Sequence, residues 1–485
     1  MPTEPGGSSL TTMRFGGIRD TFAHADGDRA TTTAKGSAAV GPWSSERVRR
    51  TAALVMLAAV VAAAIVLFAP LLGMHLPPAT LAIVVLGAVV VDLLPTRPLE
   101  TATGIGFLAL ASTNQVYAGY HLILVSALYF ARRRTGLLVL VLGALAIALP
   151  KHLFQAHYHQ PGFYNWINEP SLALALFVSA RWWRERRDGR LPVAAEQASW
   201  GEFAALYFFP GHAANPIVYS ATDLFRERRF DVRGVLVALS LLVSKSLAHA
   251  AIWRMFPNAG YATLDVGRAA TLARAPLWGI VALNYLDLAL TLSGTADLAV
   301  LIARLYGWPM PSPFRFALLA WNPGELWRRW GLYNRKFLLG LVYFPLGGGK
   351  RHRYRNVMLT FLASALLMHT GWFGSKYWQV GLAGWRDESV YFLLQGICVC
   401  TWLLCGDLRA AWARRKGRGG VPNNDDHAKS ADPTQRRSEL RFSWARVLAT
   451  LATQGTSALV HVVILAQAMP LAGRLGLIAR CLGMG

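Results

Sequence analysis

One histidine in the last third of the chain lies where an imidazole could act as a general base. His369 is near the end of Asn356–Gly374, a stretch that is otherwise apolar. An imidazole titrates close to neutral pH, so it can take the proton of an attacking hydroxyl group. Such proton removal is typically worth ~10²–10⁴-fold in rate. The alternative is a core histidine that joins two helices.

Polar and basic residues precede this histidine in the stretch Pro311–Asn356, which is dense in Trp, Arg, Pro and Gly. Asn334 could donate a hydrogen bond to a developing oxyanion, or it could be an interfacial residue bonded to backbone. The nearby basic residues could pair with phosphates or with an acidic protein, or could form a solvated face. They are Arg328, Arg329, Arg335 and Lys336, followed by the cluster Lys350–Arg355.

Ser293 and Asp297 lie four residues apart in the apolar stretch 290–308, and so on one face of a helix. A carboxylate facing lipid would be prohibitive, so Asp297 should point inward, toward a basic partner or water. We interpret this pair as structural. His212, His249 and His461 are interpreted as helix contacts rather than as catalytic groups.

The segments that must hold these side chains are typical of a multi-pass membrane protein. Hydrophobic residues make up 54% of the chain and charged residues 15%, against about a quarter charged in soluble domains. Thr51–Gly73 has no charged residue and is long enough to cross a hydrocarbon core of roughly 30 Å. It begins too far into the chain, and is too long, for a signal peptide.

Further apolar runs cover residues 78–95, 103–112, 116–131, 136–150, 169–182, 233–253, 275–303, 357–374, 387–406 and 444–470. Several are too short to cross alone, so short re-entrant or interfacial helices packed inside protein are expected. The sequence therefore predicts an all-α polytopic membrane protein with about 10–11 transmembrane helices.

The net charge of +23 comes from short basic clusters between the apolar runs. This distribution is typical of loops held on the cytoplasmic face and argues against nucleic-acid binding. It predicts a cytoplasmic N-terminus in the plasma membrane, with membrane lipids as partners. His152, His157 and His159 have no carboxylate or Cys at ligand spacing, so no metal site is expected.

Five motifs follow one another in a fixed order. They are Ser293, Gly294 and Asp297; Glu325 with Trp327, Arg328, Arg329 and Trp330; Tyr343 to Gly348; Arg355 with Asn356; and His369 to Trp372. An upstream element, Tyr207–Val218, has Asn215 where Gly is usual. This set resembles the membrane-bound O-acyltransferase (MBOAT) family, particularly its bacterial branch that acylates polysaccharides and cell-wall polymers.

The resemblance implies helices around a central tunnel and an O-acyltransferase with His369 and Asn334 as catalytic residues. It implies substrate-binding roles for Trp327, Arg328, Arg329, Trp330 and Tyr343. Structural roles would belong to Ser293, Asp297, Glu325, Pro345, Gly347, Gly348 and Asn356. The donor would be an acyl thioester of coenzyme A or of an acyl carrier protein, with no tightly bound cofactor. The acceptor would be a hydroxylated glycan, cell-wall polymer, lipid or secondary metabolite, and a partner protein could assist.

The resemblance and the apolar runs together predict six ranges. These are a disordered cytoplasmic tail (1–50), N-terminal transmembrane helices (51–200), an MBOAT-like catalytic core (201–374), a transmembrane helix (375–408), a flexible charged loop (409–441) and a C-terminal transmembrane helix with a tail (442–485).

Two departures from the family pattern leave an alternative open. Gly331 stands where His or Asn is usual, and Met368 and Thr370 flank His369 in place of Trp and Gly. The first departure puts a two-residue catalytic pair in doubt, while the second concerns packing. The alternative is a non-catalytic membrane protein, either a transporter or an inactive MBOAT-like scaffold.

Overall fold

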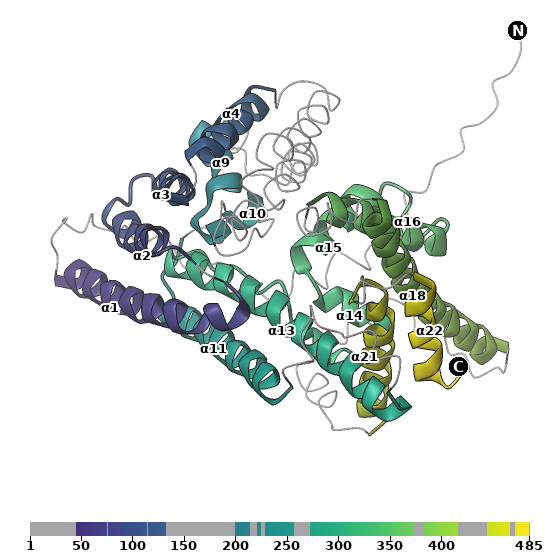
Figure 1. The fold of residues 1–485 in the computed structure, drawn as a ribbon. Coiled ribbons are helices and arrows are strands. Elements are labelled where there is room, and N and C mark those ends of the chain that lie inside the picture. Colours follow the sequence, from purple (N-terminus) through teal and green to yellow (C-terminus); the bar gives the residue numbers. More distant parts are fainter. Residues whose placement is uncertain are drawn as a thin grey trace, which may run out of the picture. The chain divides into compact units, whose positions relative to one another are not determined.

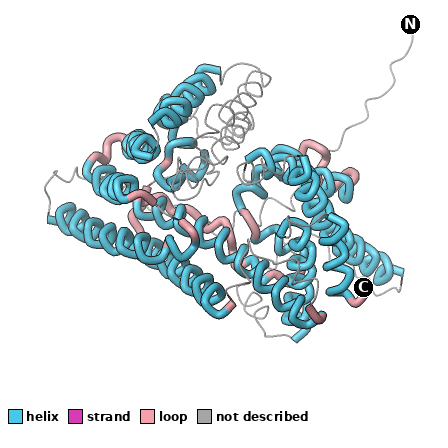
Figure 2. Tube along the Cα trace, in the orientation of Figure 1, coloured by secondary structure: helices cyan, strands magenta, loops and turns pink. Residues whose placement is uncertain are grey.

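The computed structural model describes residues 45–74, 76–113, 115–131, 199–213, 221–224, 228–256, 272–371, 382–415, 444–465 and 471–484. Every regular element in these ranges is a helix (Figures 1 and 2). The predicted all-α class is therefore confirmed for the described part of the chain.

The longer helices are α1 (Ser45–Phe68), α2 (Pro78–Leu93), α3 (Pro98–Thr113), α4 (Gln115–Ala131), α9 (Trp200–Phe208), α11 (Val232–Met255), α13 (Arg274–Leu305), α16 (Arg353–Gly371), α18 (Leu382–Arg415), α21 (Trp444–Leu465) and α22 (Leu471–Leu482). Shorter elements are η1 (Pro70–Leu72), η3 (Pro210–Ala213), α10 (Ala221–Leu224), η4 (Ala317–Leu319), α14 (Pro323–Arg329), α15 (Leu332–Leu338) and the π-helical η5 (Leu339–Tyr343).

Contacts divide the chain into two units. One comprises 1–44 and 403–446, of which the structure describes the end of α18 and the start of α21. The other comprises 45–402 and 447–485 and contains every contact described below. α1 begins inside the predicted tail, and α18 continues to Arg415, past the start of the predicted charged loop.

Four helices of the described chain are long and apolar enough to cross a membrane. They cover Val48–Leu72, Val232–Met255, Arg274–Leu305 and Ser389–Ala413. The apolar helices α2 and Ala118–Ala127 are shorter, and the predicted runs 136–150 and 169–182 lie outside the described residues. The chain is a polytopic membrane protein, as predicted.

α13 is the central helix of the larger unit. Its apolar window is 72% buried, against 33% for the windows of α1 and α11. α11 packs along α13, and α1 packs along α11 (Figure 1). α13 therefore presents most of its length to protein, whereas α1 and α11 keep apolar side chains on the outside.

Close backbone contacts join the remaining N-terminal helices. A Cβ on Gly106 of α3 would lie 1.5 Å from the carbonyl oxygen of Phe208 at the end of α9, so only glycine permits this crossing. The next residue, Phe209, packs edge-on against Trp308, just beyond α13, with ring centroids 5.3 Å apart. The upstream motif element thus contacts the end of the central helix.

Candidate functional site

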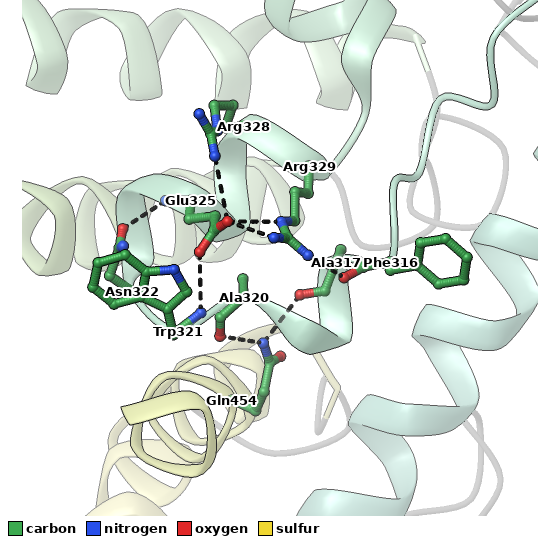
Figure 3. Close-up of polar contacts among 9 residues, drawn as sticks. All are labelled: Phe316, Ala317, Ala320, Trp321, Asn322, Glu325, Arg328, Arg329 and Gln454. Carbon is green, nitrogen blue, oxygen red and sulfur yellow. Dashed lines mark hydrogen bonds and ion pairs between the residues drawn. The ribbon is translucent and has the colours of Figure 1, made fainter. Parts of the chain in front are cut away.

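Glu325 is held at the start of α14 by a helix cap and two arginines. The Oδ1 of Asn322 accepts the Glu325 N–H at 2.7 Å, and Pro323 occupies the first turn. The buried Glu325 carboxylate accepts Nε and Nη2 of Arg329 at 3.0 and 2.5 Å, and Nη2 of Arg328 at 3.3 Å (Figure 3). Residues three and four apart share a helix face, so one short helix contains the whole ion-pair group.

The segment before α14 is anchored to α21 by an amide. Gln454 donates from Nε2 to the carbonyl oxygens of Ala317 and Ala320 at 3.1 and 3.2 Å (Figure 3). Its Oε1 accepts the hydroxyl of Tyr285 on α13 at 3.1 Å. One half-buried glutamine of α21 therefore links η4 and α13.

The two motif tryptophans pack on different neighbours. Trp327 donates to Oε1 of Gln395 on α18 at 3.3 Å and meets Phe361 of α16 edge-on, with ring centroids 5.2 Å apart. Trp330 stacks on Tyr285 at 6.2 Å with an interplanar angle of 14°. Both indoles position α14 among longer helices. That they also bind substrate stays a prediction.

Gly331 has a left-handed backbone, with φ 63° and ψ 56°, and caps the start of α15. Most residues avoid this region, whereas Gly, Asn and His tolerate it better. The glycine found here and the His or Asn usual in the family pattern therefore all tolerate a left-handed backbone. A Cβ at this position would meet only the Cβ of Asn334, at 3.9 Å, so a small side chain has space. The structure brings position 331 and Asn334 together.

The Gly-rich segment after α15 forms a tight turn. η5 ends at Tyr343, Pro345 is exposed, and Gly347 and Gly348 have φ values of +101° and +59°. These positive values favour glycine. Burial raises the pKa of the Tyr343 hydroxyl above its ordinary value, and the charge of Arg353 opposes the shift.

Asn356 ties this turn to α16. Its side chain is fully buried, and Nδ2 donates to the carbonyl oxygens of Leu346, Gly348 and Arg351 at 3.0, 2.9 and 2.6 Å. Its Oδ1 accepts Nη2 of Arg355 at 3.4 Å. Buried carbonyl groups need such donors. The amide therefore fits the structural role expected of it.

Asp297 points into the protein, as the cost of a lipid-facing carboxylate predicts. It is 1% exposed, forms an ion pair with Lys245 of α11, and accepts the Ser312 hydroxyl at 2.7 Å. Ser293 bonds to backbone of its own helix at 3.4 Å, and Gly294 lets Leu72 approach closely. The expected basic partner is thus Lys245.

The histidines occupy separate places. His369 belongs to α16, two residues before the helix ends, and its side chain lies outside the described part of the structure, as do those of Met368 and Thr370. His461 is 1% exposed, with its ring 5.8 Å from that of Tyr285 and 5.7 Å from that of Tyr391.

His249 pairs with Asp287 at 3.0 Å, and Trp253 donates to the same carboxylate oxygen at 3.0 Å. This pair connects α11 and α13 one turn from Lys245 on α11 and about three turns from Asp297 on α13. Like His461, His249 contacts neighbouring helices, which agrees with its interpretation as a helix contact.

Sequence reasoning missed several residues that connect the motifs, among them Lys245, Tyr285 and Gln395. Lys245 had a usable signal, because a lone lysine inside an apolar helix requires a partner. Trp372, Asn215, His152, His157 and His159 lie outside the described residues. In the described part of the chain, no three His, Cys, Asp or Glu side chains form a group that could hold a metal ion.

Comparisons with known proteins agree with these motifs. No protein-family model matches the sequence. The chain is 27% identical over 172 residues to a peptidoglycan O-acetyltransferase from Helicobacter pylori, covering 34% of the chain and 32% of that protein. It is 27% identical over 97 residues to a probable alginate O-acetylase from Pseudomonas putida, covering 19% of each. The matches thus span a third or less of these relatives' length. Over that part the chain is similar to O-acetyltransferases, which confirms its resemblance to the membrane-bound O-acyltransferase family.

Proposed function

We propose that this protein is a membrane-bound O-acyltransferase that moves an acyl group, acetyl or another short one, from a thioester to a hydroxyl group. The observation that carries the proposal is the similarity to two O-acetyltransferases. The packing supports it: the motif residues from Glu325 to Asn356 form one continuous unit of α14, α15, η5 and α16.

The reaction needs one proton transfer and one exchange of bonds. The hydroxyl oxygen attacks the thioester carbonyl carbon while a base takes its proton. The tetrahedral intermediate then expels the thiolate, which recovers the proton, so that an ester and a free thiol result. The demands on the protein are a base for the alcohol and donors for the oxyanion.

We assign the base to His369 and an oxyanion-stabilising role to Asn334. Asn334 lies beside position 331, where the family pattern has a polar side chain and this chain has glycine. With no side chain at Gly331, the neighbouring amide is the polar group nearest that position along the helix. Asn334 would then replace the missing residue.

The donor in this proposal is a thioester of coenzyme A or of an acyl carrier protein, entering from the cytoplasmic side. The acceptor is a glycan, a cell-wall polymer or another hydroxylated molecule. The similar proteins act, by their names, on peptidoglycan and alginate. The N-terminus is cytoplasmic in this proposal, because basic residues, Arg47, Arg49 and Arg50, precede the first span.

The test uses membranes containing the full chain, radiolabelled acetyl-coenzyme A and candidate acceptors. We expect transfer of label in wild type and a loss of 10²-fold or more, roughly the worth of a general base, in His369→Ala. His461→Ala is the matched control, since it removes a buried imidazole from the same unit. Equal turnover in wild type and His369→Ala, at equal protein level, would contradict the assigned base. Absence of label transfer to every acceptor, in wild type, would favour the non-catalytic alternative.

A further inference from the structure

Polar side chains line the contact between α11 and α13, two helices that are long and apolar enough to cross a membrane. Arg304, near the end of α13, donates to the Gly234 carbonyl near the start of α11 at 2.7 Å, so the two helices run antiparallel. Farther along, the ion pairs of Lys245 and His249 join the same faces. The polar contact therefore extends along much of both helices.

His249 has one ring nitrogen in a polar contact and the other without a protein partner. Its Nε2 lies 3.0 Å from Oδ1 of Asp287, so this nitrogen carries a proton and donates to the carboxylate. In the neutral ring, Nδ1 is then an acceptor. This Nδ1 is buried and bonds to no group of the described chain. The carboxylate therefore fixes the tautomer of the ring and leaves a buried acceptor on its other nitrogen.

Two more buried polar atoms in this contact are without a protein partner. Ser246 is 0% exposed and lies one turn before His249 on α11, and its hydroxyl group bonds to none of the described residues. Asn284 is also 0% exposed and lies one turn before Asp287 on α13. Its Nδ2 donates to the Ile280 carbonyl at 2.9 Å, whereas its Oδ1 accepts from no donor in the described ranges. All three unpaired atoms thus lie within one turn of the His249 and Asp287 pair.

Unpaired polar atoms are costly at this depth, because lipid offers no hydrogen bonds in place of those of water. Ser246 and His249 are three residues apart, so their Cβ atoms are about 5–6 Å apart. One water molecule spans such a distance, and buried water typically satisfies polar groups that have no protein partner. A cation is disfavoured, since the ammonium group of Lys245 belongs to the same contact.

We propose that the contact between α11 and α13 contains a binding site for water. One water molecule bridges the Ser246 hydroxyl and Nδ1 of His249, and a second one donates to Oδ1 of Asn284. The site is independent of the proposed acyl transfer. It gives an imidazole that is oriented by a carboxylate contact with exchangeable water inside a membrane span, where a purely structural ion pair would be dry.

Radiolytic footprinting tests the site, because an X-ray pulse splits bound water into hydroxyl radicals that oxidise the side chains beside it. The full chain in lipid nanodiscs would be irradiated, and oxidised residues located by mass spectrometry. Trp308 is the reference, since it is 2% exposed and its N–H already donates to the Leu224 carbonyl at 2.9 Å. After correction for intrinsic reactivity, we expect His249 to be oxidised several times faster than Trp308. Equal rates would overturn the water site.

Rapid mixing with heavy-oxygen water separates bound water from solvent that leaks along the helices. Side chains in contact with bulk water incorporate the heavy oxygen at once. We expect His249 to incorporate it only after a delay, because bound water must first exchange. Incorporation without delay would assign the oxidation to bulk solvent and so contradict a bound molecule.

Ser246→Ala removes the hydroxyl group that holds the bridging water. We expect the oxidation of His249 to fall severalfold and the melting temperature in detergent to fall, since the water molecule loses a partner. At a dry site the same variant would remove an unpaired polar group and raise the melting temperature, and that result would refute the proposal. Ser244→Ala is the matched control, because its exposed hydroxyl already donates to the Leu241 carbonyl at 3.1 Å. It should change neither quantity.

Asn284→Leu tests the second water molecule, because leucine has a similar size and no acceptor. A lower melting temperature, with the oxidation of His249 retained, supports a water molecule at Asn284. A higher melting temperature would show that the amide oxygen is unbonded in the folded protein and would overturn that half of the site.

Discussion

Two regions of this molecule hold charged and titratable side chains in different ways. Between α11 and α13, Lys245 pairs with Asp297 and His249 with Asp287, so each carboxylate has its own partner. Around the Gly331 turn, by contrast, Arg315 and Arg328 are exposed and Arg335 is half-buried, and Arg328 has one contact of 3.3 Å to Glu325.

The difference separates paired groups inside the protein from charges that face solvent. A paired charge in a membrane span joins two helices and requires nothing from outside, because each group satisfies the other. Exposed arginines with little pairing stay solvated and add little stability. The first region therefore stabilises the packing of the helices, and the arginines of the second contribute less to it.

The largest expected effect follows from breaking the paired region. Asp297→Ala leaves the half-buried Lys245 without its carboxylate, and we expect a loss of about 3–5 kcal/mol in the free energy of unfolding. Denaturation in detergent measures it. The double variant Asp297→Leu with Lys245→Leu should recover most of the loss, because no uncompensated charge remains. If Asp297→Ala were as stable as wild type, the pair of Lys245 and Asp297 would not stabilise the fold, and the distinction between the two regions would be lost.

A smaller effect is expected when the second region loses its carboxylate. Glu325→Gln should lower the free energy of unfolding by about 2 kcal/mol, because the bonds from Arg329 are no longer charge-assisted. Denaturation in detergent measures this change, and a Glu325→Gln variant as stable as wild type would contradict a stabilising role for the ion pairs of α14.

The smallest effect concerns the Gly331 turn, which lies between Arg328 of α14 and Arg335 of α15. Gly331→Ala should cost about 1–2 kcal/mol, the penalty of a side chain in the left-handed region. Gly331→Asn should cost less, because asparagine tolerates that backbone. Space is not the cause, since only the Asn334 Cβ lies near. Thermal unfolding of the pair is the measurement, and equal melting temperatures for the two variants would argue against backbone strain at this position.

Helix positions were predictable because the membrane imposes a simple rule. The runs 233–253 and 275–303 correspond closely to α11 and α13, since a span must be apolar for about 20 residues. The inward orientation of Asp297 was predictable for the same reason. Its partner Lys245 was not identified, because two helices distant in sequence can align in many registers.

The candidate site was predictable in its residues but not in its contacts. The motifs indicated Trp327, Trp330 and Asn356, whereas the neighbours Tyr285 and Gln395 come from helices without any motif. The left-handed backbone of Gly331 also could not be inferred, because glycine is compatible with almost every conformation. These contacts depend on packing between segments distant in sequence, and local sequence patterns do not indicate it.

Asn356 has one further consequence, which concerns motion. Its amide fastens three carbonyl groups of the Gly-rich turn to the first turn of α16, so the turn and the helix must shift as one body. His369 lies on the same helix, roughly 20 Å farther along its axis at 1.5 Å per residue. A ligand that displaces the turn would therefore also displace the backbone of His369, which gives the two ends of α16 a mechanical connection without any intervening chain of side chains.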